Sequence, residues 1–207
     1  RESEEMLKAS LEIRKRLAKE NPLTFEPTLA ESYHNLAFLY DKTQRFRESE
    51  EMLKASLEIR KRLAKDNPLT YETALAESYK DLAFLYDKTL RFTESEEMFK
   101  ALISIYEHLY KNTPQLYRYY LSEGYYCYGM SMIKNKKYND AIIPFKRSLD
   151  LCKGMTNELK NNAIYMLNLL CLVELHNNNK NYTTAHIYNE KLLPLLKANF
   201  ENDNKKW

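Results

Sequence analysis

Apolar side chains recur at intervals of three and four residues along most of this chain, a period that predicts amphipathic helices. The first clear stripe consists of Ala30, Tyr33, Leu36, Ala37 and Tyr40. A polar stretch at residues 41–45 interrupts the pattern. The stripe that follows consists of Met52, Ala55, Ile59 and Leu63. The pattern therefore predicts two helices joined by a short turn, which together form a helical hairpin.

The dipeptide Asn67-Pro68 predicts the end of the second helix of a hairpin. The residue before a proline disfavours the helical conformation, and proline itself has no backbone N–H to donate. We therefore expect a loop of about eight residues between one hairpin and the next, which in the first copy includes residues 23–28.

Hairpins of this kind repeat along the chain with a period of 46 residues. Residues 47–92 match residues 1–46 at 39 of 46 positions, and a weaker third copy begins at Thr93. An aromatic residue ends each copy in the same register: Phe46, Phe92, Tyr138 and, in a last copy that is two residues shorter, Tyr182. A fixed period in this range indicates stacked units, each of which buries its apolar face against its neighbours.

Bulky and small residues alternate in each copy at positions where the two helices of a hairpin would cross closely. In the first copy these positions hold Tyr33, Leu36, Ala37, Tyr40, Phe46, Ser49, Leu53 and Ser56. On these residues the chain resembles the tetratricopeptide repeat (TPR) family, in the elongated form of kinesin light chain and of many bacterial scaffold and regulatory proteins. The resemblance covers essentially the whole chain. It implies an all-α fold, a right-handed α-solenoid of TPR-like helical hairpins.

We predict a single solenoid over residues 1–207. Its parts are an orphan second helix at 1–21, repeats at 28–66, 74–112 and 116–153, a degenerate repeat at 157–199 and a frayed tail at 200–207. The orphan helix would expose an apolar stripe formed by Met6, Ala9, Ile13 and Leu17. Because repeat arrays need their end faces covered, we expect either further repeats before this helix or self-association through its edge.

The TPR resemblance implies that the first helix of each hairpin lines a concave groove that binds a partner. The outward positions of these helices are Glu31, His34, Asn35, Phe38, Asp41, Glu77, Lys80, Asp81, Phe84, Asp87, Glu123, Tyr126 and Met130. Exposed aromatic residues such as Phe38 and Phe84 are good anchors for a peptide or a helix. The acidic positions favour a basic or mixed-charge ligand, although neighbouring lysines balance much of their charge.

The first two copies differ at only seven positions, and two of these differences, His34/Lys80 and Asn35/Asp81, lie in the groove helix. Adaptation to a ligand and neutral drift at exposed positions would both produce this pattern.

The composition argues against several other classes of function. A net charge of +3 is too small to indicate nucleic-acid binding, and no apolar run is long enough to span a membrane. The chain has no glycine-rich phosphate loop, no nucleophile–histidine pairing and no metal-ligand spacing, so we expect no enzyme activity, no cofactor and no metal. Three cysteines, Cys127, Cys152 and Cys171, fall inside helical patterns, which favours free thiols and a cytoplasmic location.

The sequence thus predicts a protein–protein interaction scaffold that binds a peptide or a helix in the groove of a TPR array. An alternative is a sensor or regulatory module of a larger protein, whose catalytic or DNA-binding domain lies outside this chain. A third possibility is that the near-identical copies make this a structural spacer, or even an engineered array. The divergent third and fourth copies argue against design.

Overall fold

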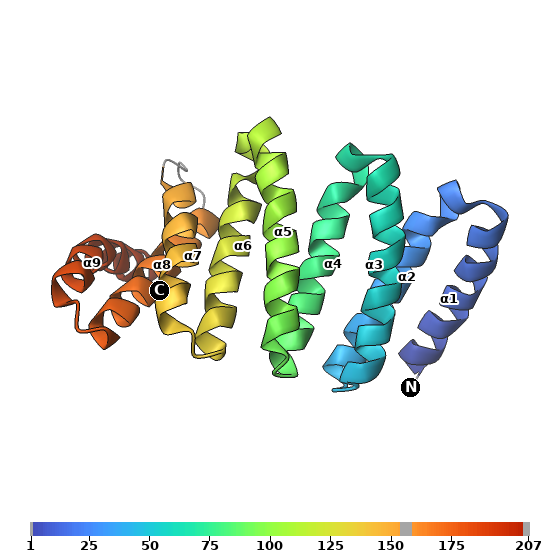
Figure 1. The fold of residues 1–207 in the computed structure, drawn as a ribbon, viewed down its shortest axis with the longest axis horizontal. Coiled ribbons are helices and arrows are strands. Elements are labelled where there is room, and N and C mark those ends of the chain that lie inside the picture. Colours follow the sequence, from blue (N-terminus) through green and yellow to red (C-terminus); the bar gives the residue numbers. More distant parts are fainter. Residues whose placement is uncertain (1, 154–158, 205–207) are drawn as a thin grey trace. The chain divides into compact units, whose positions relative to one another are not determined.

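The structure, a computed structural model, describes residues 2–153 and 159–204 (Figure 1). Within these ranges every regular element is an α-helix, which confirms the predicted all-α repeat fold. The chain forms two compact units, Arg1–Tyr106 and Glu107–Trp207. The boundary between them falls within helix α5 (Phe92–Asn112).

In the first unit, consecutive helices pack against one another in antiparallel pairs (Figure 1). These helices are α1 (Glu2–Glu20), α2 (Pro22–Lys42), α3 (Phe46–Asp66), α4 (Pro68–Lys88) and the first part of α5. The stripe residues Leu36, Ala37 and Tyr40 are buried, as the hairpin pattern predicts. On α1, by contrast, the side chains of Met6 and Ile13 are 71% and 50% exposed.

The predicted eight-residue loop between hairpins is wrong, because α2 and α4 begin directly at Pro22 and Pro68. Asn67 ends one helix and caps the next: its N–H donates to Leu63 O at 2.9 Å, and its side-chain oxygen accepts the N–H of Thr70 at 3.3 Å. Proline is well tolerated at the first helical position, where its missing N–H would have no partner in the helix. The Asn-Pro signal is therefore both a helix end and a helix start.

The turn inside each hairpin has the same backbone conformation in all four copies. One residue in each turn takes a positive φ of 57–60°: Gln44, Leu90, Lys136 and Lys180. In the first turn the N–H of Arg45 donates to Tyr40 O at 2.8 Å, which satisfies a carbonyl at the helix end. These turns recur at the spacing of the sequence copies, so the repeat register read from the sequence is also the structural register.

Buried serines hold the two helices of the first full hairpin together. Ser49 Oγ donates to Ala37 O and Ser56 Oγ donates to Ala30 O, both at 2.9 Å. Small side chains at these positions let the two backbones approach, and their hydroxyl groups reach carbonyls that already accept helical hydrogen bonds.

The second unit contains the end of α5 and four further helices. These are α6 (Pro114–Lys134), α7 (Tyr138–Cys152), α8 (Leu159–Asn178) and α9 (Tyr182–Asn204). Gly129 of α6 faces the ring of Phe145 of α7 so closely that a Cβ atom built on this glycine would lie 2.8 Å from Phe145 Cζ. Since α9 continues to Asn204, the predicted frayed tail is wrong for residues 200–204. Residues 205–207, and the predicted start of the degenerate repeat at 157, lie outside the described residues.

Candidate functional site: a hollow between α2 and α4

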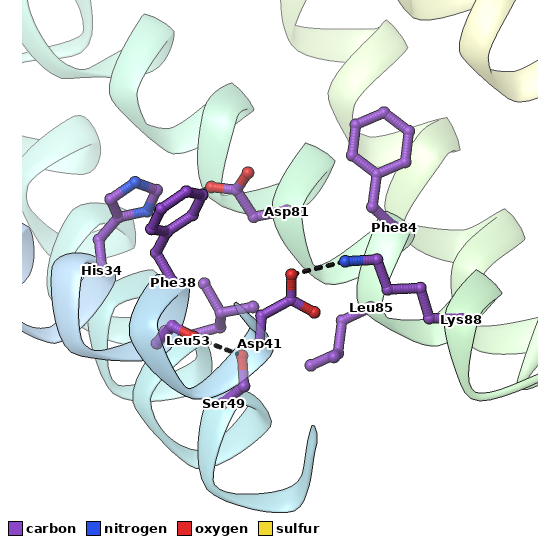
Figure 2. A pocket seen from close by; sticks show the side chains of 10 residues that line it. His34, Phe38, Asp41, Ser49, Leu53, Asp81, Phe84, Leu85 and Lys88 are labelled. Carbon is purple, nitrogen blue, oxygen red and sulfur yellow. Dashed lines mark hydrogen bonds and ion pairs between the residues drawn. The ribbon is translucent and has the colours of Figure 1, made fainter. Parts of the chain in front are cut away.

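Three helices of the first unit surround a hollow of about 190 Å³ (Figure 2). The lining residues come from α2 (His34, Ala37, Phe38 and Asp41), α3 (Ser49 and Leu53) and α4 (Asp81, Phe84, Leu85 and Lys88). Five of them, His34, Phe38, Asp41, Asp81 and Phe84, are residues that the sequence predicts to face a binding groove. The volume is smaller than that of a typical small-molecule site and is better matched to one or two inserted side chains.

Helix α2 presents His34, Phe38 and Asp41 on one face, because residues three and four apart lie one above the other along a helix. The side chain of Phe38 is 59% exposed, as the sequence predicts. Lys42 Nζ lies 5.1 Å from the centroid of its ring, at the range of a cation–π contact. A large aromatic surface therefore remains in contact with solvent at the rim of the hollow.

Helix α4 contributes Asp81, Phe84 and Lys88, which are also three and four residues apart. The ring of Phe84 packs edge-on against Phe99 of α5, with centroids 5.8 Å apart and an interplanar angle of 76°. Phe84 is consequently only partly exposed, less than the sequence led us to expect. Of the two predicted anchors, Phe38 is therefore the more exposed, whereas Phe84 is held in place by its contact with Phe99.

Acidic and basic side chains alternate around the hollow. Lys88 Nζ lies 2.5 Å from Asp41 Oδ2, an ion pair that links α4 to α2 (Figure 2). His34 Nδ1 lies 3.2 Å from Asp81 Oδ2, but the two atoms do not form a hydrogen bond, and both are buried without a hydrogen-bond partner among the described residues. The other carboxylate oxygen of Asp41, Oδ1, is buried and has no hydrogen-bond partner among the described residues.

The base of the hollow is apolar. Leu53 and Leu85 lie there (Figure 2), and Ala37 also lines the hollow. The one hydroxyl in the lining, Ser49 Oγ, already donates to the carbonyl of Ala37. The site thus combines an apolar base, an exposed aromatic ring and a buried carboxylate oxygen without a donor. Such a combination suits an apolar side chain accompanied by a hydrogen-bond donor or a positive charge.

The other predicted groove residues of this unit do not line the hollow. Glu31 and Asn35 are exposed on α2. Glu77 accepts from Lys80 Nζ at 2.7 Å and from Tyr106 Oη at 2.9 Å. Glu77 and Lys80, both predicted groove residues, therefore already have partners on the protein.

Asp87 is only 4% exposed, so the expectation that it faces a ligand is wrong. Helical spacing assigned it to the groove face, but helical spacing takes no account of the side chains that neighbouring helices lay over that face.

The remaining predicted groove residues, Glu123, Tyr126 and Met130, belong to the second unit. None of the three is fully exposed. The ring of Tyr126 packs against Phe145 with centroids 5.9 Å apart, and Met130 Sδ lies 4.0 Å from Cys171 Sγ. There, Tyr126 and Met130 contribute to packing within the unit.

Among the described residues, no three His, Cys, Asp or Glu side chains gather in a way that could hold a metal ion. None of the helices in residues 2–153 and 159–204 combines the length and the apolar character needed to cross a membrane.

A tetratricopeptide repeat family model matches residues 29–68, the first full hairpin. No curated protein is significantly similar to the chain in sequence.

Several solved structures have the same fold at low sequence identity. The nearly identical TPR-like repeats of a candidate kinesin light chain from Podosopora anserina are 16% identical, with a TM-score of 0.63; the match covers 93% of this chain and 88% of that one. BtubC (BKLC) from P. vanneervenii is 18% identical, with a TM-score of 0.52 and coverage of 94% and 90%. The apo form of RapI is 16% identical, with a TM-score of 0.68, and the match covers 92% of this chain but 49% of RapI. This chain therefore contains a tetratricopeptide repeat at residues 29–68 and has the all-α fold of TPR-like repeat proteins.

Proposed function

We propose that this protein is an interaction module that binds a peptide segment of a partner protein in the hollow between α2 and α4. TPR repeat proteins are generally protein-interaction scaffolds, and the repeat fold is typically non-catalytic. The observation that carries the proposal is the exposed ring of Phe38 beside an apolar hollow whose size suits one or two side chains.

The chemistry of the hollow suggests the type of peptide. An apolar side chain would enter the base formed by Ala37, Leu53 and Leu85, and its backbone or a neighbouring Lys or Arg would supply the donor that Asp41 Oδ1 lacks. The ion pair between Lys88 and Asp41 would hold α2 and α4 at a fixed spacing. A preformed spacing of this kind lowers the entropy lost on binding.

The test starts with peptides selected from a random displayed library on the whole chain. The affinity of a selected peptide is then measured for the wild type and for Phe38→Ala. Truncating a central aromatic anchor costs more than about 1 kcal/mol, so we expect at least roughly a tenfold loss of affinity. Leu23→Ala is the matched control, because Leu23 is on the same helix, is highly exposed and lies outside the hollow.

The charge preference is tested separately with Asp41→Asn. This change should weaken peptides that carry Lys or Arg next to their apolar residue more than it weakens uncharged ones. If Phe38→Ala and Leu23→Ala bind every selected peptide as well as the wild type does, the hollow is not the binding site.

The alternative, that the array is a regulatory module of a larger protein, receives support from the match to RapI, of which it covers about half. A selected peptide would serve to test it as well: in the larger protein, the peptide should change the activity of the attached domain, and Phe38→Ala should abolish that change.

A further inference from the structure

The second unit contains a cavity of about 410 Å³, larger than the hollow between α2 and α4. None of the groove residues predicted from the sequence lines it. Its lining residues are Glu107, Tyr110 and Lys111 from the end of α5, Arg118, Leu121 and Tyr125 from α6, and Arg147, Asp150 and Leu151 from α7. The volume falls within the usual range of sites for small organic molecules.

Three cationic side chains line this cavity, whereas its two acidic side chains are already engaged. Glu107 accepts the hydroxyl hydrogen of Tyr125 at 2.5 Å. Asp150 is paired with Lys153 Nζ, also at 2.5 Å. Lys153 thus offsets the charge of Asp150, and Glu107, whose hydrogen bond to a neutral phenol leaves its charge in place, is the one remaining carboxylate against the three cations that line the cavity.

The cations themselves have few partners within the described residues. Arg147 and Lys111 make no hydrogen bond or ion pair there. Arg118 makes a long hydrogen bond of 3.4 Å to the carbonyl of Lys153, and its guanidinium carbon lies 5.9 Å from the ring centroid of Tyr110. Neither contact neutralises the charge of Arg118, so the cavity holds positive charge that an anion could pair with.

The walls beside these cations are apolar or aromatic. Leu121 is buried, and Tyr110, Tyr125 and Leu151 are partly buried. Burial and the hydrogen bond to Glu107 raise the pKa of Tyr125 to about 12, so its phenol stays neutral at physiological pH. An anion that enters the cavity therefore meets no negative charge from this ring.

We propose that this cavity binds a small organic anion, with a phosphate or carboxylate group paired to Arg118 and Arg147 and an aromatic or apolar body against Tyr110, Tyr125 and Leu121. Planar guanidinium groups suit both phosphate and carboxylate, because they can donate two parallel hydrogen bonds. The aromatic walls would bind the body of the ligand and would disfavour fully hydrated inorganic ions.

The experiment is a titration of the whole chain followed by heteronuclear NMR or calorimetry. The probes are phenyl phosphate and phenylacetate, which separate phosphate from carboxylate recognition. Benzyl alcohol has an aromatic ring but no charge, and inorganic phosphate has the charge but no aromatic ring. The variants are Arg147→Gln and Arg118→Gln, and the control is Lys146→Gln, since Lys146 is exposed and outside the cavity.

We expect at least one anionic probe to bind and to lose roughly tenfold or more in affinity in Arg147→Gln and in Arg118→Gln, as is typical when a hydrogen bond to a charged group is removed. Lys146→Gln should bind like the wild type. Benzyl alcohol and inorganic phosphate should each bind at least about tenfold more weakly than that probe.

Several results would overturn the proposal: no binding of either anionic probe, equal affinity in all three variants, or benzyl alcohol or inorganic phosphate binding as tightly as the anionic probes. Phe38→Ala should leave this binding unchanged, because Phe38 belongs to the other unit, so failure of this proposal and failure of the peptide site are distinguishable.

Discussion

Replacing Gly129 with alanine sets two physical effects against each other. Alanine is favoured over glycine within a helix by about 1 kcal/mol, so helix propensity alone predicts that Gly129→Ala stabilises α6. A Cβ atom at this position, however, would lie 2.8 Å from Phe145 Cζ, 2.9 Å from Cε1 and 3.0 Å from Cε2. Since carbon atoms pack at about 3.5–4.0 Å, the ring would have to move by roughly 0.5–1 Å.

The ring of Phe145 has little room for this movement, because it is fully buried and packs against Tyr126. Overpacking of this kind costs about 1–3 kcal/mol. After the gain in helix propensity is subtracted, we expect Gly129→Ala to lower the free energy of unfolding by about 1 kcal/mol. For a unit of about 100 residues this corresponds to a fall of about 4–8 °C in Tm.

The assay is thermal and urea unfolding followed by circular dichroism, in a cycle that combines Gly129→Ala with Phe145→Leu. The double variant reproduces the Ala37/Leu53 pair that occupies the same register in the first copy. Phe145→Leu makes room for the new methyl group, so the two changes should couple favourably by about 1 kcal/mol. If Gly129→Ala alone raises stability by about 1 kcal/mol and shows no coupling, helix propensity governs this contact and the packing argument is wrong.

Three further predictions concern the first unit. Asn67→Ala removes a helix cap and should lower the free energy of unfolding by about 1 kcal/mol in urea titration, and an unchanged value would count against the capping role. Leu90→Gly removes a non-glycine residue at φ 60° and should raise the free energy of unfolding by up to about 1 kcal/mol. A clear fall in the free energy of unfolding would show that Leu90 is not strained. Hydrogen bonds from Lys8 and Arg45 lower the pKa of Glu4 to about 2, so the contribution of this carboxylate to stability is complete above about pH 4.5 and is lost as the pH falls towards 2. When Tm is measured against pH, the Glu4→Gln variant should lose less stability than the wild type as the pH falls from about 4.5 towards 2. A curve parallel to that of the wild type would refute the role given to Glu4.

Much of the fold could be predicted because it is specified by residues close together in the sequence. The period of the apolar stripes gives the helices, and the 46-residue repeat gives their pairing. The Asn-Pro pattern predicts only one of the two roles of these residues. Proline ends one helix, but Asn67 also caps the next, and the second role became evident only from the hydrogen bonds on both sides of the residue.

The candidate peptide site was predictable in part. His34, Phe38 and Asp41 share a face of α2 because of helical spacing alone, and the structure does place them around one hollow. Helical spacing did not show that Asp87 is buried or that Phe99 covers one side of Phe84. Both outcomes depend on side chains of neighbouring helices.

The sequence by itself determined the helices, their repeat and the face of each helix that carries polar and aromatic residues, because these depend on spacing along the chain. Only the tertiary structure decided which of those faces encloses a cavity. The cavity lined by Tyr110, Arg118 and Arg147 combines three different helices, and none of the three residues stands out in the sequence. Cavities form where packed side chains fail to fill the space between helices, and that depends on how the helices pack and how their side chains are oriented.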